Sequence, residues 1–168
     1  MDMKCVQKRC EARLRDLPIP VPFDVHVFAA QVAARRGRPI VLHPMLLLGS
    51  PFGACVPRPA ADYVVYEQDT TPLHRQHIIV HELCHLICGH LAVGAGDSIA
   101  FRSAASPDEP QALPRATYDD DDEQEAEMLT TLILVRVYGA QANTAATDPD
   151  VVGVLRLLDC LEGLNSGG

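Results

Sequence analysis

A run of five residues, His81-Glu82-Leu83-Cys84-His85, combines two imidazoles and a carboxylate at a spacing that suits metal chemistry. Residues four apart lie one turn apart on the same face of an α-helix, so His81 and His85 can bind one metal ion. Glu82 lies next to that face. A zinc ion held by neutral imidazoles polarises a bound water, and the adjacent carboxylate can accept a proton as that water attacks a carbonyl. The motif therefore indicates zinc-dependent hydrolysis.

The residues around this motif predict the helix that must position it. Thr71 suits the N-cap, Pro72 the first helical position, and Gly89 the C-terminal end. One face of the segment is apolar and consists of Ile79, Val80, Leu83, Leu86, Ile87 and Leu91. The opposite face carries His74, His77, His81, Cys84, His85 and Cys88. We therefore expect the first face to pack in the core and the second face to line the site.

Several residues near the motif have alternative interpretations. His77 could polarise a substrate carbonyl or bind a second metal ion, although a solvated side chain is the simpler interpretation. We expect His90 to cap the helix rather than to bind the metal. Cys84 and Cys88 are interpreted as small buried side chains, and a thiolate-bound or redox-sensitive site is the alternative.

A second group of carboxylates stands at the start of another predicted helix. Four consecutive acidic residues, 119 to 122, suit the positive end of a helix dipole, and residues 123 to 138 are apolar nearly all round. Glu123 and Glu127 share one face of this helix, whereas Glu125 points to the other side. An unpaired buried carboxylate is costly, so we expect the first two to pair with the metal and with a ligand histidine.

The remaining helical segments are placed by capping and proline signals. Residues 3 to 16 permit a short helix laid on the surface, which prolines at positions 18, 20 and 22 end. Asp24 suits the N-cap of a helix that ends at Gly37. Residues 150 to 161 carry an apolar stripe, which predicts a final helix that closes the core.

Three short β-favouring runs, residues 40 to 42, 54 to 56 and 63 to 67, predict a small antiparallel sheet. We expect the last of these to offer main-chain pairing to an extended peptide. Residues 92 to 117, rich in Gly, Ala, Ser and Pro, predict a long loop that could act as a lid. The predicted fold class is α+β, with the small sheet packed on a helical bundle and a zincin-like active-site helix.

Composition limits the classes of protein that this chain can belong to. Its 168 residues suggest a single domain, residues 24 to 164, preceded by an N-terminal arm, residues 1 to 23. The net charge of -8 argues against direct binding to nucleic acid. The N-terminus has no apolar core of a signal peptide and no run of 18 apolar residues occurs, which predicts a soluble, cytoplasmic protein without membrane spans. We therefore expect the six cysteines to be reduced thiols.

The two motifs together resemble the ImmA/IrrE family of zinc metallopeptidases. The second motif is Glu123-Gln124-Glu125-Ala126-Glu127, which runs into Leu132-Ile133-Leu134, and the resemblance covers roughly residues 24 to 138. It implies a gluzincin-type site in which His81, His85 and Glu123 bind zinc and Glu82 is the general base. It also implies that Glu127 orients a ligand histidine.

This chain departs from the family pattern at two positions of the second motif. Glu127 stands where the family has a shorter Asn or Asp, and Leu129 stands where the family has an aromatic residue. Because the longer side chain of Glu127 can reach further, Glu127 is the alternative to Glu123 as the acidic ligand. A hydroxyl that stabilises the oxyanion could come from Tyr63, Tyr66 or Tyr118.

The resemblance also implies a biological role. Family members cleave, or by another route inactivate, helix-turn-helix repressors of stress-response or mobile-element genes. We therefore expect a zinc endopeptidase whose protein substrate is a repressor on a separate chain. The alternatives are a non-catalytic, zinc-stabilised protein that sequesters the repressor, and a structural zinc site with Cys84 or Cys88 as its fourth ligand. The presence of Glu82 favours hydrolysis.

Overall fold

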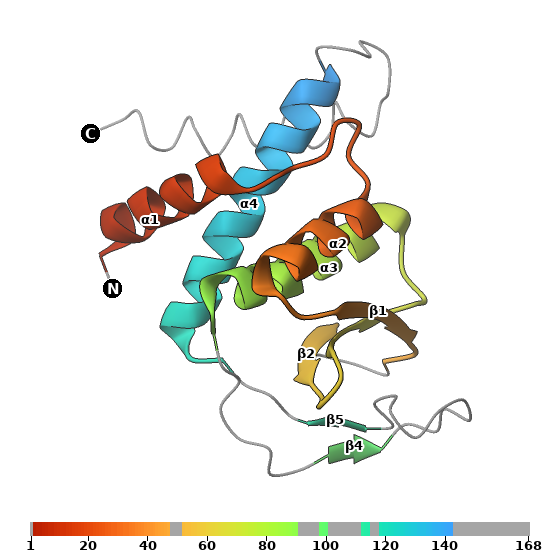
Figure 1. The fold of residues 1–168 in the computed structure, drawn as a ribbon. Coiled ribbons are helices and arrows are strands. Elements are labelled where there is room, and N and C mark those ends of the chain that lie inside the picture. The colour runs from red at the N-terminus through yellow and green to blue at the C-terminus, as the bar shows by residue number, and fades with distance from the viewer. Residues whose placement is uncertain (1, 48–51, 91–97, 101–111, 115–117, 143–168) are drawn as a thin grey trace.

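A computed structural model describes residues 2–47, 52–90, 98–100, 112–114 and 118–142 of the chain (Figure 1). It has an α+β fold, which confirms the predicted fold class. The helices are α1 (Met3–Asp16), α2 (Val25–Arg36), α3 (Pro72–Cys88) and α4 (Asp120–Ala142). The strands are β1 (Ile40–Met45), β2 (Gly53–Pro57), β3 (Asp62–Glu67), β4 (Ser98–Ala100) and β5 (Ala112–Pro114).

The three-stranded sheet has the order β1-β3-β2, with β1 parallel and β2 antiparallel to β3. The sheet is therefore mixed, and the predicted antiparallel pairing holds for β2 and β3. The prediction that residues 63 to 67 are free to pair with a peptide is wrong, because β3 is paired on both sides. All six residues of β3 are buried, as is typical of a central strand. The prolines within the sheet, Pro44 and Pro57, lie on the two edge strands.

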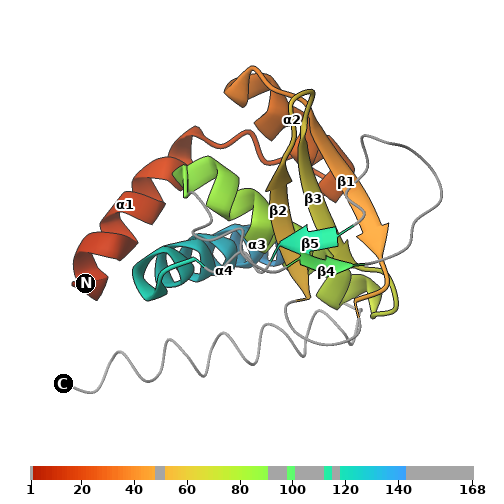
Figure 2. The same ribbon diagram turned by 90° about the horizontal axis from the view of Figure 1, so that it is seen from below.

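Helix α3 lies at the centre of the molecule, with the sheet and α2 on one side and α4 on the other (Figure 2). The predicted caps are confirmed: the hydroxyl of Thr71 accepts a hydrogen bond from the backbone N–H of His74, and Gly89 ends the helix with a φ of 79°. Cys84 is fully buried in the core because α4 covers that face, which confirms its interpretation as a small buried side chain. The expectation that the whole face with the histidines lines the site is wrong at this position.

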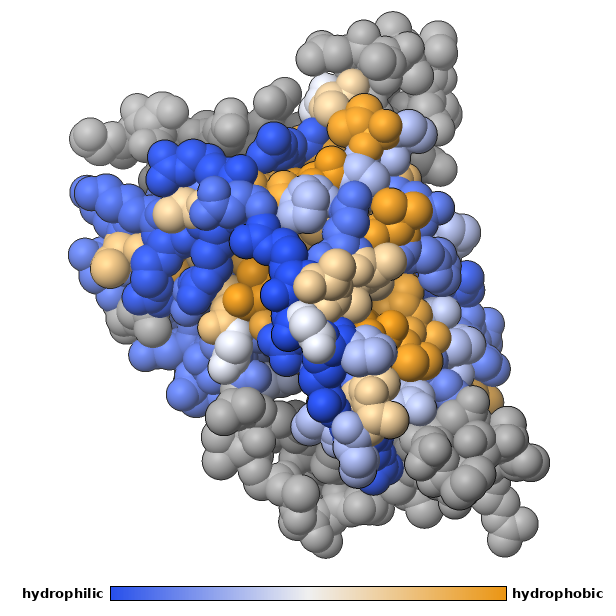
Figure 3. Space-filling view, in the orientation of Figure 1, coloured by the Kyte–Doolittle hydropathy of each residue, from blue (hydrophilic) through white to orange (hydrophobic). Residues whose placement is uncertain are grey.

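The N-terminal helix α1 is more than an arm on the surface. It packs against α4, and its Val6 and Cys10 side chains are fully buried in the same core as α3. In Figure 3 hydrophilic side chains prevail over α1, and hydrophobic patches lie on the α2 side of the same face. The exposed apolar side chains include Val21 and Val27. The boundary between an arm and a domain stays a prediction.

Part of the predicted loop, residues 92 to 117, is a small hairpin in the structure. Strands β4 and β5 pair antiparallel, with Ile99 opposite Leu113. The other residues of this loop, and the helix predicted for residues 150 to 161, lie outside the described residues. Among the described helices, none is long and apolar enough to cross a lipid bilayer.

Candidate metal centre

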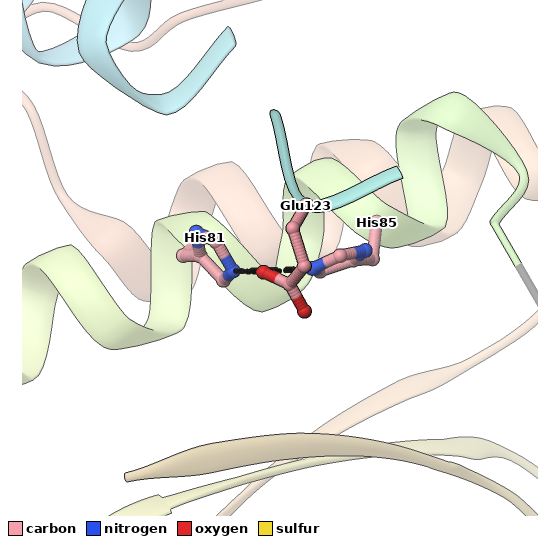
Figure 4. A group of neighbouring side chains, drawn as sticks. All are labelled: His81, His85 and Glu123. Atoms are coloured by element: carbon pink, nitrogen blue, oxygen red, sulfur yellow. Dashed lines mark hydrogen bonds and ion pairs between the residues drawn. The ribbon is translucent and has the colours of Figure 1, made fainter. Parts of the chain in front are cut away.

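The structure brings His81, His85 and Glu123 together between α3 and the first turn of α4 (Figure 4). The two histidines lie one turn apart on α3, and their Nε2 atoms are 3.1 Å apart. Oε2 of Glu123 lies 3.3 Å from Nε2 of His81 and 3.7 Å from Nε2 of His85. Two ring nitrogens and one carboxylate oxygen therefore converge on one point.

The spacing of these three atoms can be compared with the ligand shell of a divalent ion. Ligand atoms about 2.0 to 2.2 Å from a tetrahedral zinc ion lie about 3.3 to 3.6 Å from one another. The observed separations of 3.1, 3.3 and 3.7 Å differ from these values by only a few tenths of an ångström. The donor atoms, imidazole nitrogen and carboxylate oxygen, are also those that zinc binds. Donor type and spacing both fit a zinc ion.

The two histidines differ in their surroundings. The His85 side chain is fully buried, and burial lowers its pKa to about 3, with the nearby His81 and His90 acting in the same direction. This imidazole is therefore neutral and can offer a lone pair. Burial also lowers the pKa of His81, but the hydrogen bond to Glu127 and the carboxylates around it outweigh that effect, so its pKa lies above the ordinary value.

Glu127 lies on the other side of the His81 ring from Glu123. Its Oε2 is 3.3 Å from Nδ1 of His81, the nitrogen that faces away from the three-atom cluster. The hydrogen bond to His81 lowers the pKa of Glu127, so the carboxylate is ionised and accepts. This geometry fits the two roles that the resemblance implies, with Glu123 as ligand and Glu127 as the carboxylate that orients His81. The assignment itself stays a prediction.

Glu82 is buried beside the cluster, with 6% of its surface exposed. Burial raises the pKa of its carboxyl to about 7, although His81 and Cys55 act in the opposite direction. Its Oε2 atom has no hydrogen-bond partner within the described part of the chain. The carboxylate fits there because position 53 is glycine: a Cβ atom on Gly53 would lie 2.9 Å from Oε1 of Glu82. Glu82 thus has the location and pKa of a proton acceptor that works near neutral pH.

A pocket of about 400 Å³ opens beside the cluster. Its lining comes from α3, α4, the start of β2, the residue before β2 and a tyrosine two residues before α4. The lining residues are Phe52, Gly53, Ala54, His74, His77, Ile78, His81, Glu82, Tyr118, Glu123 and Glu127. The start of the edge strand β2 therefore borders the site, whereas β3, from which we expected peptide docking, does not.

Of the three tyrosines considered for the oxyanion, Tyr118 lines this pocket. Its ring stacks on that of His85, with centroids 3.6 Å apart and planes 12° apart. Burial raises its pKa, so its phenol is protonated and can donate a hydrogen bond. Tyr63 and Tyr66 lie in β3 and belong to hydrophobic clusters of the core.

The other histidines on α3 line the same pocket. His77 stacks above His81, and its Nε2 lies 3.8 Å from Oε2 of Glu127. Nδ1 of His74 is 2.8 Å from the hydroxyl of Thr70. Neither belongs to the three-atom cluster.

A second cluster, which the sequence analysis did not predict, lies behind His85. One ligand-type atom each of Cys88, His90 and Glu125 lies within 4.8 Å of the other two. His90 caps the helix as expected, because its backbone N–H bonds the carbonyl of His85, but its ring also contacts the ring of His85. The sequence Cys88-Gly89-His90, which begins three positions after the last residue of the HExxH motif, was the available signal. Glu125 could not be connected to it without knowing how α4 packs.

No protein-family model, curated protein or solved structure matches this chain. The resemblance to the ImmA/IrrE family therefore rests on the two motifs, and the function rests on the geometry of the site.

Proposed function

We propose that this protein is a zinc-dependent endopeptidase. The observation that supports this most is the combination of two elements in one pocket. One is the cluster of His81, His85 and Glu123, whose donor atoms and spacing fit zinc. The other is the buried carboxylate of Glu82, which follows the first histidine and has a pKa of about 7. A structural zinc site would not require a proton acceptor at this position.

The residues around the cluster divide the work of peptide hydrolysis. A zinc ion bound by the three ligands would polarise the scissile carbonyl and lower the pKa of a water molecule. Glu82 accepts the proton of the attacking water at its carboxylate and then gives it to the nitrogen of the leaving amine. The C–O bond forms and the C–N bond breaks, so the carboxylate returns to its ionised form. A pKa of about 7 suits both halves of this proton transfer at neutral pH.

Two further side chains support the reaction from the walls of the pocket. The Tyr118 phenol can donate a hydrogen bond to the oxyanion that develops on the substrate carbonyl. Glu127 accepts a hydrogen bond from the Nδ1–H of His81 and so leaves the Nε2 lone pair of that ring directed at Glu123 and His85, where it would bind the metal. We expect substitution of either residue to slow hydrolysis less than substitution of Glu82 or of a zinc ligand.

We further propose that the enzyme acts in the cytoplasm on a helix-turn-helix repressor. The substrate class comes from the resemblance of the two motifs to the ImmA/IrrE family. The net charge of -8 supports it, because a DNA-binding repressor is basic and would be attracted to an acidic enzyme. Association should therefore weaken as salt is added.

The decisive experiment compares wild type with Glu82→Gln, which keeps the size of the side chain and removes the base. Both proteins should bind about one zinc per chain. Only wild type should cleave a basic helix-turn-helix repressor, as followed by mass spectrometry of the products. Casein, run in parallel, tests whether the substrate must be a repressor.

Each outcome bears on a different part of the proposal. Equal inactivation of the repressor by both proteins, without cleavage, would favour the non-catalytic sequestering role. A wild-type protein that binds no zinc would overturn the proposal as a whole. Equal cleavage of casein and repressor would support the peptidase activity and contradict the proposal that the substrate is a repressor.

A further inference from the structure

His90 connects the candidate metal ligand His85 to a group of charged side chains, of which Glu125 is buried. The His90 side chain is 6% exposed, and its Nδ1 lies 3.1 Å from Nδ1 of His85. On the other side of the ring, its Nε2 lies 3.4 Å from Oδ1 of Asp122 and 3.5 Å from Oε2 of Glu125. The ring of His90 is therefore placed between an imidazole and two carboxylates.

The chemistry of these neighbours fixes where the protons are. An ionised carboxylate only accepts hydrogen bonds, so the nitrogen of His90 that faces Asp122 and Glu125 carries the proton. In a neutral ring the other nitrogen, Nδ1, is then an acceptor. Nδ1 of His85 must in turn be the donor to it, which leaves the Nε2 lone pair of His85 directed at His81 and Glu123.

We propose that His90 is a positioning residue for the metal centre, which holds His85 in the tautomer that binds metal through Nε2. The inference rests on the proposed metal centre and adds to it a residue that touches neither the metal nor the substrate. Hydrogen-bond partners of a ligand histidine orient its ring and raise the basicity of the coordinating nitrogen.

Helix α1 anchors the far end of this chain of contacts. Glu125 is 7% exposed and accepts hydrogen bonds from Nε and Nη2 of Arg9, at 3.2 and 3.0 Å, and from Nη1 of Arg13. The two guanidinium groups keep the carboxylate ionised, because they lower its pKa against the opposing effect of burial. Helix α1 and the metal centre are thus connected through Glu125, His90 and His85.

The same residues could be interpreted as a second metal site, since Cys88, His90 and Glu125 lie within 4.8 Å of one another. The contacts oppose this interpretation. Both oxygens of Glu125 already accept hydrogen bonds from arginines, whose charges repel a cation. Burial also raises the pKa of Cys88 to about 12, which adds to the cost of forming the thiolate that a metal binds. A positioning role for His90 accounts for its contacts with His85, Asp122 and Glu125.

The test uses two substitutions of almost equal shape. In His90→Asn the Oδ1 atom can take the place of Nδ1 as acceptor, whereas His90→Leu has the same branching and no acceptor. His90→Ala removes the ring without placing an apolar side chain beside Asp122, and serves if His90→Leu does not fold. His26→Leu, on the exposed surface of α2, is the matched control.

The measurements are zinc affinity, from competition with a chromophoric chelator, and the visible absorption of the Co²⁺-loaded protein. We expect His90→Leu and His90→Ala to bind zinc about 10- to 100-fold more weakly than wild type and to change the Co²⁺ spectrum. His90→Asn should retain most of the affinity, and His26→Leu all of it. Thermal melts of the metal-free proteins show whether each variant is folded.

Three results would overturn the inference. Wild-type affinity and an unchanged Co²⁺ spectrum in folded His90→Leu would remove the positioning role and leave the peptidase proposal intact. Two zinc ions per wild-type chain, one of which is lost in Cys88→Ser, would make His90 a ligand of a second site. A wild-type protein without zinc affinity would overturn the metal centre, and this inference with it.

Discussion

Glu123 and Glu127 lie on opposite sides of His81, and substituting each of them separates a ligand from an orienting carboxylate. Glu123 faces Nε2 of His81 at 3.3 Å, on the side where His85 also points, whereas Glu127 faces Nδ1 at 3.3 Å. We predict that both Glu123→Ala and Glu127→Ala weaken zinc binding and that the loss is larger for Glu123→Ala.

The expected magnitudes follow from these positions. Structural zinc ions held by four ligands are bound by about 10 to 16 kcal/mol, or roughly 2.5 to 4 kcal/mol per ligand. Loss of Glu123 as a ligand should therefore lower the affinity on the order of 100- to 1000-fold. Loss of an outer carboxylate costs about 10- to 100-fold, and about half of the Glu127 side chain is exposed, so its effect should lie at the lower end.

The assay is a competition titration of metal-free protein with a chromophoric zinc chelator. Asp120→Ala, an exposed residue in the same turn of α4, is the control and should bind zinc as wild type does. Glu127→Gln keeps an oxygen that can accept from Nδ1 of His81, and should restore most of what Glu127→Ala loses. Glu123→Gln replaces a charged ligand by a neutral one, so it should not restore zinc affinity relative to Glu123→Ala in the same way.

The reverse order would refute this reasoning. Full zinc affinity in Glu123→Ala, together with its loss in both Glu127 variants, would make Glu127 the ligand. The Glu127 carboxylate would then be the acidic ligand in place of Glu123. Equal and small effects of all four variants would show that the acidic ligand comes from elsewhere in the chain.

Three further predictions concern the surroundings of the site and the core. Gly53→Ala would place a Cβ atom 2.6 Å from Cγ2 of Ile78 and 2.9 Å from Oε1 of Glu82. We therefore expect the rate of hydrolysis to fall about 10- to 100-fold with zinc content unchanged, and a wild-type kcat would contradict this prediction. The pKa of Glu125 lies below its ordinary 4.5, so its carboxylate stabilises the fold above that pH and this contribution is lost as the pH falls through the lowered pKa. Urea unfolding at several pH values should therefore show Glu125→Gln destabilised at neutral pH and close to wild type in strong acid; a constant difference would argue against it. The Ile133 side chain on α4 is fully buried. Ile133→Ala should therefore lower the free energy of unfolding by about 2 to 5 kcal/mol, and Ile133→Val should lower it by about 1 kcal/mol. Equal small losses in the two variants would mean that the core is loosely packed.

Local signals in the sequence sufficed to predict where two helices begin and end, one of which, α3, carries both candidate histidine ligands. Thr71 and Gly89 predicted both ends of α3, and Asp24 and Gly37 did the same for α2. These signals work because a cap is made by residues within one turn of the helix end. The four-residue spacing of His81 and His85 likewise fixes their relative position as soon as the helix forms.

What the tertiary structure decided is how these elements meet. The run from 63 to 67 lies at the centre of the sheet, because β1 pairs with one side of β3 and β2 pairs with the other. No local pattern in the sequence specifies that order. The packing of α4 on α3 buries Cys84 and brings Glu123 to the histidines. The contacts of Glu125 with Arg9 and Arg13 join residues 116 and 112 positions apart. Such contacts depend on how whole elements pack against one another, so the sequence could predict a helix with candidate zinc ligands but not the network of charged residues behind it.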